Sequence, residues 1–275
     1  MRLSVLSSGS SGNAAYVECG AGGLLIDAGL SHRRLQNLLA RIGRSLNDVR
    51  GVLLTHDHTD HTCGAGALAR DFGLPILAAP GVREGVRHAS AAIEAGEGFE
   101  VGGLAATFFE VPHDSPTYGV RISGDGRDLA AATDLGEAGA GVLDWMRGAE
   151  AVVLEANYDP DWLAGGPYPA RLKRRISSRY GHLSNRQTAQ AAVALAPHGL
   201  KDLVLAHLSK TNNSPARACG TVHGALREAG YGGVRVRAAI ANHPTPWIEV
   251  GTPVEVPEYV YRYPQEDAGQ LFGIE

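Results

Sequence analysis

Short apolar runs separated by glycine, serine and proline predict a chain rich in strands. The predicted strands cover residues 3–6, 14–19, 24–28, 51–54, 75–78, 104–111, 118–122, 128–132, 151–154 and 203–206. Apolar residues at helical spacing predict helices at residues 31–42 and 63–72, and further helices are predicted for a basic segment at 170–178, an alanine-rich segment at 185–195 and residues 216–228. Strands followed by helices in both halves indicate an α/β (α+β) fold of two mixed sheets with helices on the outside, an αββα sandwich.

The domain organisation follows from the absence of an internal repeat and of a long linker in the sequence. We expect a single domain over residues 1–275, in which the Pro- and Glu-rich tail at residues 241–275 packs on the surface. The stretch from residue 158 to residue 169 is polar and rich in Pro and Gly, and it is expected to form a loop.

Composition narrows the class of protein. Hydrophobic residues make up 44% and charged residues 20%, the profile of a soluble globular protein. No apolar run reaches the ~18–20 residues of a membrane span, and the first residues lack the features of a secretory signal. The three cysteines are widely spaced, which favours reduced thiols in the cytoplasm. The net charge of −4 means that any attraction for phosphate must be local, and no membrane partner is expected.

The segment Thr-His-Asp-His-Thr-Asp-His at residues 55–61 follows a predicted buried strand. In an extended chain His56 and His58 point the same way and can bind one ion, and the following turn brings Asp60 and His61 to a second position. Imidazole and carboxylate ligands suit zinc, manganese or iron. A solvated polar loop is the alternative, but four ligands in six residues after an apolar strand are unusual for a surface loop.

Three more candidate ligands follow predicted strands. His113 comes after the strand at 104–111, Asp134 after the strand at 128–132 and His207 after the strand at 203–206. A lone histidine at a strand end is usually structural, but three candidate ligands at the ends of three strands, in a chain with the His-rich motif, favour a metal site. His182 is a second late histidine that competes with His207 for the role of ligand.

These motifs, together with Leu-Ile-Asp-Ala-Gly at residues 25–29, resemble the metallo-β-lactamase superfamily over roughly residues 1–240. The resemblance implies two divalent ions and seven ligands: His56, His58 and His113 for one ion, Asp60, His61 and His207 for the other, and Asp134 between them. It also implies that Asp27 lies behind the ligands and orders the His-rich loop. Zn²⁺ fits this ligand set best, and Mn²⁺ is the alternative.

Local motifs resemble particular families within this superfamily. The segments at residues 180–187 and 203–209 are similar to the C-terminal part of ribonuclease Z, which implies a catalytic role for His182 and a ligand role for His207. The segments at 7–13, 154–159 and 207–213 resemble the bacterial YycJ/WalJ family of nucleases. Tyr158 departs from that pattern, because a histidine is expected there in many relatives.

Residues near these motifs are candidates for binding a phosphodiester. Two divalent ions with two carboxylates and a hydroxide leave about one net positive charge, which suits such a substrate. We assign catalysis to Asp60 and His182, and substrate binding to hydroxyl, amide and guanidinium groups at Ser10, Asn13, Ser184, Ser209, Asn212, Asn213, Arg174 and Arg175. Arg174 and Arg175 belong to a basic run whose other interpretation is a solvated helix face.

The sequence therefore predicts a metal-dependent phosphodiesterase or nuclease that hydrolyses nucleic acid with a metal-activated hydroxide. DNA is expected over RNA, with exonuclease action. Three alternatives are a hydrolase of small phosphodiesters or other esters, an RNA-processing ribonuclease, and a metalloprotein without catalysis. The intact ligand set argues against the last. The oligomeric state is left open by the sequence.

Overall fold

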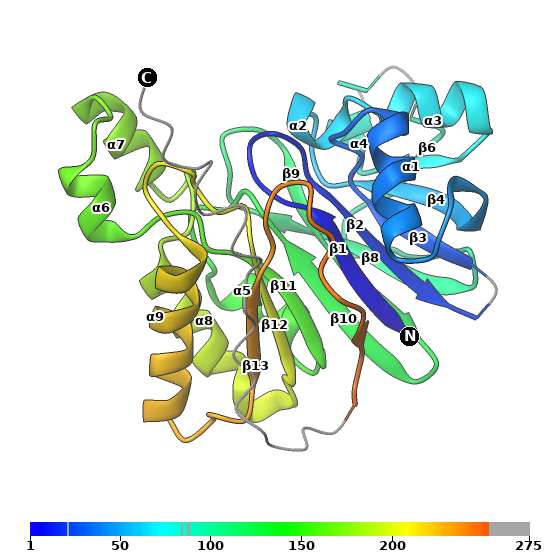
Figure 1. Cartoon of the computed structure of the whole chain (residues 1–275). Coiled ribbons are helices and arrows are strands. Elements are labelled where there is room, and N and C mark those ends of the chain that lie inside the picture. The colour runs from blue at the N-terminus through cyan, green and yellow to red at the C-terminus, as the bar shows by residue number, and fades with distance from the viewer. Residues whose placement is uncertain (21, 84, 87–88, 253–275) are drawn as a thin grey trace.

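The computed structural model of the protein describes residues 1–20, 22–83, 85–86 and 89–252. Over these ranges two β-sheets face each other and helices cover their outer faces (Figure 1). The predicted αββα sandwich is confirmed. Of the expected C-terminal tail, residues 253–275 lie outside the described residues, and the remaining part begins with a bridge between Ile240 and His243 and continues into an edge strand.

The first sheet has seven strands among the described residues. Their spatial order is β14 (Ile248–Glu249), β1 (Arg2–Ser7), β2 (Ala14–Cys19), β3 (Gly22–Ile26), β4 (Val49–Leu54), β5 (Ile76–Ala78) and β6 (Ala91–Ala92). Strands β1, β2 and β3 pair antiparallel, whereas β3, β4, β5 and β6 pair parallel. The carboxyl ends of β3 and β4 therefore meet at one edge of this sheet.

The second sheet also has seven strands within the described part of the chain. Their order is β13 (Arg235–Ala238), β12 (Asp202–Ala206), β11 (Ala151–Glu155), β10 (Arg127–Ala132), β9 (Thr117–Gly124), β8 (Leu104–Val111) and β7 (Gly98–Val101). Strands β10 to β13 are parallel, and β9 is antiparallel to both β8 and β10. The carboxyl ends of β8, β10, β11 and β12 therefore also lie along one edge.

The helices divide between the two sheets (Figure 1). Beside the first sheet lie α1 (His32–Arg41), α2 (Thr59–Thr62), α3 (Ala65–Phe72), α4 (Pro80–Arg83) and the 3₁₀ turn Leu46–Asp48. Beside the second sheet lie α5 (Ala140–Met146), α8 (Asn185–Leu195), the 3₁₀ turn Ala196–His198 and α9 (Pro215–Glu228), while α6 (Pro160–Gly165) and α7 (Ala170–Ile176) stand at its end (Figure 1). None of the described helices is long and apolar enough to cross a membrane.

Three apolar clusters hold these layers together. The middle one lies between the sheets and contains Leu53, Phe108 and Val204, all fully buried. The outer ones pack α1, α3 and α4 on the first sheet and α5, α8 and α9 on the second. The near-continuous apolar runs of β4, β11 and β12 follow from burial on both faces.

Several elements differ from the sequence prediction. The stretch 158–169 contains α6, because Asp159 caps its first turn and Pro160 occupies the first helical position. The helix predicted at 63–72 is α3, which begins at Ala65, and the short helix α2 before it was not predicted. Gly64 lies between the two, where a Cβ would be 2.1 Å from the Leu30 carbonyl oxygen. Strand β13 was not predicted, since its pattern alternates arginine with apolar residues and its pairing with β12 is a long-range contact.

Candidate metal centre and active site

The predicted site residues meet where the carboxyl ends of the strands of both sheets converge. His56 follows β4, His113 follows β8, Asp134 follows β10 and His207 follows β12. Parallel strands expose their carboxyl ends at the same edge, so ligands that are far apart in sequence become neighbours there. Asp134 and His207 both have positive φ angles, 57° and 54°, a conformation that costs free energy in a residue other than glycine and often marks functional positions.

Asp27 holds the His-rich loop from behind. It follows β3 with a φ of 61°, and its carboxylate accepts hydrogen bonds from the Thr55 backbone N–H at 2.9 Å and from His61 Nδ1 at 2.7 Å. Gly29 permits the close approach of the loop, since a Cβ there would lie only 1.6 Å from the Asp60 carbonyl oxygen. The loop is therefore fixed by a buried carboxylate and by close backbone packing.

Five histidine side chains share one arrangement. In each, Nδ1 is engaged by a neighbouring group: the hydroxyl of Thr55 for His56, Asp27 for His61, the carbonyl of Gly181 for His113, and Glu155 for both His182 and His207. With Nδ1 donating, the lone pair of each ring in its neutral form lies on Nε2, which is then the nitrogen that can bind a metal. This is how metal-binding histidines are usually oriented, with the second nitrogen held by a carboxylate or a carbonyl.

The Nε2 atoms of His61 and His207 lie close to two carboxylates. His61 Nε2 is 3.1 Å from Asp134 Oδ2 and 3.7 Å from Asp60 Oδ2, and His207 Nε2 is also 3.7 Å from Asp60 Oδ2. The rings of His56 and His58 lie 4.6 Å apart and each is within 6 Å of the His113 ring. The seven ligands predicted from the sequence thus form one cluster.

Three polar atoms in this cluster form no hydrogen bond with any of the described residues. They are His56 Nε2, Asp134 Oδ2 and His207 Nε2, all buried. A buried polar atom without a partner is costly, and several such atoms pointing at one another are expected where a cation binds. Nitrogen and carboxylate donors of this kind fit divalent transition metals, so the residues present fit a metal centre.

The pKa shifts show how strongly the charges interact. Burial holds the pKa of His56 down at about 2. Burial also lowers the pKa of His61, but the carboxylates of Asp27 and Asp134 outweigh it and raise that pKa to about 10. Burial raises the pKa of Asp134, but the neighbouring His207 and His61 lower it well below its usual value. The Asp134 carboxylate therefore stays ionised at the centre of the cluster.

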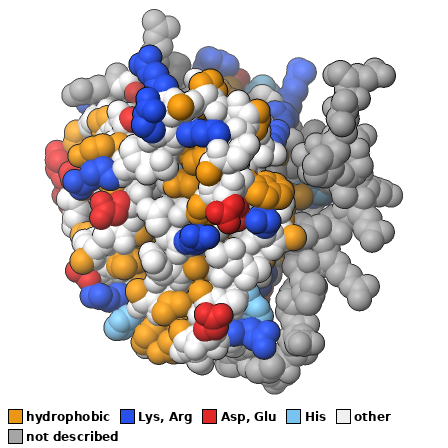
Figure 2. Space-filling model, turned by 90° about the vertical axis from the view of Figure 1, so that its left-hand side faces the viewer, with side chains coloured by type: hydrophobic (Ala, Val, Ile, Leu, Met, Phe, Trp, Pro, Cys, Tyr) orange, Lys and Arg blue, Asp and Glu red, His pale blue; other side chains and the backbone are white. Residues whose placement is uncertain are grey.

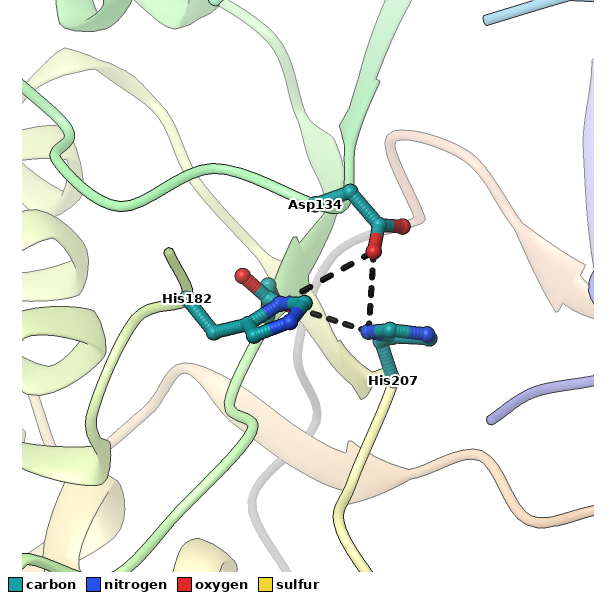
Figure 3. Close-up of side chains that lie close together, drawn as sticks. Asp134, His182 and His207 are labelled. Carbon is teal, nitrogen blue, oxygen red and sulfur yellow. Dashed lines mark hydrogen bonds and ion pairs between the residues drawn. The ribbon is translucent and has the colours of Figure 1, made fainter. Parts of the chain in front are cut away.

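Glu155 is a buried residue of this site that the sequence analysis did not single out. Its Oε1 lies 2.8 Å from Nδ1 of both His182 and His207, and its Oε2 accepts the backbone N–H groups of Leu135 and Leu183. Figure 3 shows His182 and His207 side by side next to Asp134. A carboxylate at the end of a buried strand is the signal that would have identified Glu155, as it did Asp134.

Asp114 is a second carboxylate missed by the sequence analysis. One of its oxygens lies 3.2 Å from His113 Nε2 and 3.9 Å from His58 Nε2, and the other forms an ion pair with Arg175 of α7. Burial raises the pKa of Asp114, and its hydrogen bond to Arg175 and the nearby histidines lower it below the usual value. Asp114 therefore connects the helix α7 to the metal-ligand cluster.

A cavity of about 490 Å³ opens over the cluster. Its floor contains Asp60, His113, Asp134, His182 and His207. The volume falls within the ~300–1,000 Å³ of typical small-molecule sites. A substrate group of nucleotide size therefore has access to the candidate ligands and to His182.

The predicted substrate-binding residues occupy different places. Ser10, Ser209 and Arg175 line the cavity. Arg174 is exposed outside it, and Ser184 caps α8 in a capping box with Gln187. The three asparagines lie beneath the surface: Asn13 with its Nδ2 2.9 Å from His61 Nε2, Asn213 hydrogen-bonded to Asn185, and Asn212 buried behind Ser209.

Tyr158 occupies a position where the family resemblance predicts a histidine. It is buried, with 6% of its surface exposed, and forms an isolated bridge with Ser184 beside the start of α8. It does not line the cavity described above. Tyr158 therefore supports the loop that carries His182 rather than the cavity floor.

Comparisons with known proteins give a consistent family. Residues 23–208 match the family described as the beta-lactamase superfamily domain. The chain is 36% identical over 242 residues to exodeoxyribonuclease YycJ of Bacillus anthracis, which covers 84% of this chain and 91% of that protein. It is 34% identical over 243 residues to exodeoxyribonuclease WalJ of Streptococcus pneumoniae, and the match covers 84% of this chain and 90% of that protein. The structure of the short form of human tRNase Z shares the fold, with a TM-score of 0.60 and 17% identity. The match covers 91% of this chain and 99% of that structure.

Proposed function

The chain belongs to the metallo-β-lactamase superfamily as a metal-dependent hydrolase, and we propose that it is an exonuclease that hydrolyses phosphodiester bonds at the ends of DNA. The observation that carries this proposal is the placement of His182 on the cavity floor, next to the ligand cluster. The names of the two relatives, both exodeoxyribonucleases, support the choice of substrate.

Two divalent ions are proposed for the cluster, with Zn²⁺ as the preferred metal and Mn²⁺ as the alternative. Their ligands would be the seven residues predicted from the sequence: His56, His58, Asp60, His61, His113, Asp134 and His207. Such ions act as Lewis acids toward phosphoryl oxygens and lower the pKa of water. Asp27 and Glu155 would orient the imidazoles of His61 and His207 from behind.

His182 is proposed as the general acid. Its Nδ1 donates to Glu155, and although burial lowers the pKa of His182, the Glu155 carboxylate raises it above its usual value. The protonated ring then also carries a proton on Nε2, which it can donate to the leaving oxygen of the cleaved phosphodiester in the cavity. Asp60 lies on the same floor, and although burial raises its pKa, His207 and His61 lower it below the usual value, so it remains an acceptor. It is proposed to orient the attacking water by accepting a hydrogen bond.

The proposed function predicts a specific pattern of digestion. The purified protein with zinc or manganese should release mononucleotides from the ends of labelled linear DNA and leave covalently closed circular DNA intact. RNA and a chromogenic phosphodiester should be hydrolysed more slowly, because they lack the features of a DNA end. Gel analysis of the products, with single- and double-stranded substrates side by side, checks this. Cleavage of closed circles would contradict exonuclease action, and equal rates on RNA would contradict the preference for DNA.

Arg174 is proposed to contact the phosphate backbone of the bound strand. It is exposed on α7 next to the cavity, and Lys and Arg side chains gather at the height of α6 and α7 on the face shown in Figure 2. Arg174→Glu should weaken DNA binding and reduce the slope of log affinity against log salt by about 0.9 for duplex DNA, the value for one phosphate contact. Hydrolysis of a small chromogenic phosphodiester should be unchanged.

The matched control for Arg174→Glu is Arg227→Glu. Arg227 is exposed in the last turn of α9, at the C-terminal end of the helix, which lies away from the site. Affinity measured at several salt concentrations should be the same for Arg227→Glu and for the unchanged protein. If Arg174→Glu leaves the salt slope intact, or slows both substrates equally, its side chain does not contact the backbone.

A further inference from the structure

One wall of the cavity is apolar, although its floor is strongly polar. Tyr168, Leu172 and Ile176 line this wall, the last two spaced one helical turn apart on α7. Helix α7 has no buried residue, so these apolar side chains are not part of a core. Each is only half-buried, and each faces the space above the ligand cluster. An apolar helix face of this kind is expected to be covered by a ligand.

The local sequence holds Tyr168 in place. It lies between Pro167 and Pro169, in the connection from α6 to α7. A proline fixes its own φ and restricts the residue before it to extended conformations, so the backbone of this tripeptide has little freedom. The ring is therefore presented to the cavity at a low cost in conformational entropy.

Helix α7 is also fixed relative to the proposed general acid. The backbone N–H of His182 donates to the Ile176 carbonyl oxygen at 2.9 Å, and Lys173 Nζ reaches the Ala164 carbonyl oxygen at 2.6 Å. Gly181 permits this contact, because a Cβ there would lie 2.2 Å from the Ile176 oxygen. The apolar wall and His182 are thus parts of one local structure, and a ligand on the wall has a defined position relative to the acid.

The remaining walls supply polar groups. Ser10, Ser209, Lys210 and Thr211 line the cavity together with Leu208. The cavity as a whole combines a floor for metal ions and phosphate, hydroxyl and ammonium groups, and an aromatic and aliphatic wall. A nucleotide has the matching parts: a phosphate, a sugar and a flat base with an apolar face. A simple phosphodiester would leave the wall uncovered.

We propose that Tyr168, Leu172 and Ile176 form a nucleobase subsite, in which the terminal base of a DNA strand stacks on Tyr168 while its phosphate lies over the ligand cluster. The subsite rests on the proposed function and adds the means by which the enzyme recognises a strand end. Stacking is available to every base, so recognition there is tolerant of sequence. The cavity volume of about 490 Å³ suits a single nucleotide.

The test compares Tyr168→Ala with Tyr168→Phe, which keeps the ring, and with Phe72→Ala, which removes an exposed aromatic ring from α3 outside the cavity. The probe is the 5′-monophosphate of 2-aminopurine deoxyriboside, whose fluorescence is quenched when it stacks. Deoxyribose 5-phosphate, which lacks a base, is the competitor. In parallel, hydrolysis rates are measured on DNA with a normal or an abasic terminal nucleotide. Leu172→Ala provides a second variant of the wall.

The unchanged protein should quench the probe, and the abasic competitor should bind much more weakly. Tyr168→Ala should bind the probe roughly 5- to 150-fold more weakly, the range found when a stacking aromatic is replaced by alanine. Leu172→Ala should show a smaller loss, whereas Tyr168→Phe and Phe72→Ala should bind like the unchanged protein. Tyr168→Ala should also hydrolyse normal and abasic ends at similar rates.

Equal binding of the probe by Tyr168→Ala and the unchanged protein, or equal use of normal and abasic ends by the unchanged protein, would overturn the subsite. The unchanged protein could instead fail to hydrolyse DNA and still bind the probe more tightly than the abasic competitor. That result would overturn the proposed function and support the subsite. If the unchanged protein neither hydrolyses DNA nor binds the probe, both the proposed function and the subsite are overturned.

Discussion

Replacing His182 by alanine is expected to reduce the turnover of DNA by about 10²–10⁴-fold while the protein keeps its metal ions, since this is the usual contribution of a positioned acid or base. The side chain lines the cavity, and its Nδ1 is held by Glu155. Removing it takes away the proton donor for the leaving oxygen but none of the seven proposed ligands. Metal content and rate, measured on the same sample, separate these two effects.

His207→Ala is the informative comparison. His207 is buried at the end of β12, and its Nε2 lies 3.7 Å from Asp60 Oδ2 without a hydrogen bond to any described residue. Its loss should weaken or empty one metal site. His198→Ala, which changes an exposed histidine in the 3₁₀ turn after α8, should alter neither quantity. If His182→Ala empties a site while His207→Ala retains its ions, the two assignments must be exchanged.

Removing the metal is expected to abolish activity altogether. Dialysis against a chelator should stop hydrolysis of DNA and of a chromogenic phosphodiester alike, and added Zn²⁺ or Mn²⁺ should restore it. Elemental analysis after saturation should find close to two equivalents per chain, because the proposed ligands form two sets of three with Asp134 between them. A stoichiometry of one that added metal cannot raise would contradict the binuclear centre.

The same experiment has a readout that does not depend on activity. Binding of metal to the folded state alone stabilises it, by about 4 kcal/mol when the free metal is 1,000-fold above its dissociation constant. The melting temperature of the unchanged protein should therefore rise on loading. Asp134→Asn, which keeps the shape of the side chain and removes its charge, should show a smaller rise and a lower metal content. An identical rise for this variant would show that Asp134 is not a ligand.

The sequence by itself determined the layers of the fold. The apolar runs of β4, β11 and β12 have one interpretation as buried strands, because each is short, bounded by polar or turn residues and rich in branched side chains. The hydroxyl groups of Ser31 and Ser184 cap the first turns of α1 and α8, and the predicted helices begin at or directly after these residues. These features depend on neighbours within a few residues, so they can be predicted from the sequence alone.

The sequence also predicted that the His-rich loop and the later strand ends hold the ligands. The reason is the chemistry of the residues: histidine and aspartate directly after buried strands have few other uses in such numbers. Glu155 escaped this reasoning, although it stands at the end of β11, because a single carboxylate has no characteristic spacing with its partners. His182 and His207, which it contacts, lie 27 and 52 residues further along the chain.

Only the tertiary structure decided which residues line the cavity. Ser184, Asn13 and Asn213 have the same kinds of polar groups as Ser10 and Ser209, yet the first three are engaged within the protein and the last two face the cavity. Leu172 and Ile176 are spaced like residues that face a core, but α7 has no buried residue and both side chains line the cavity over the metal-ligand cluster. Local sequence fixes which side of a helix is apolar, whereas the contacts between distant segments fix what that side faces.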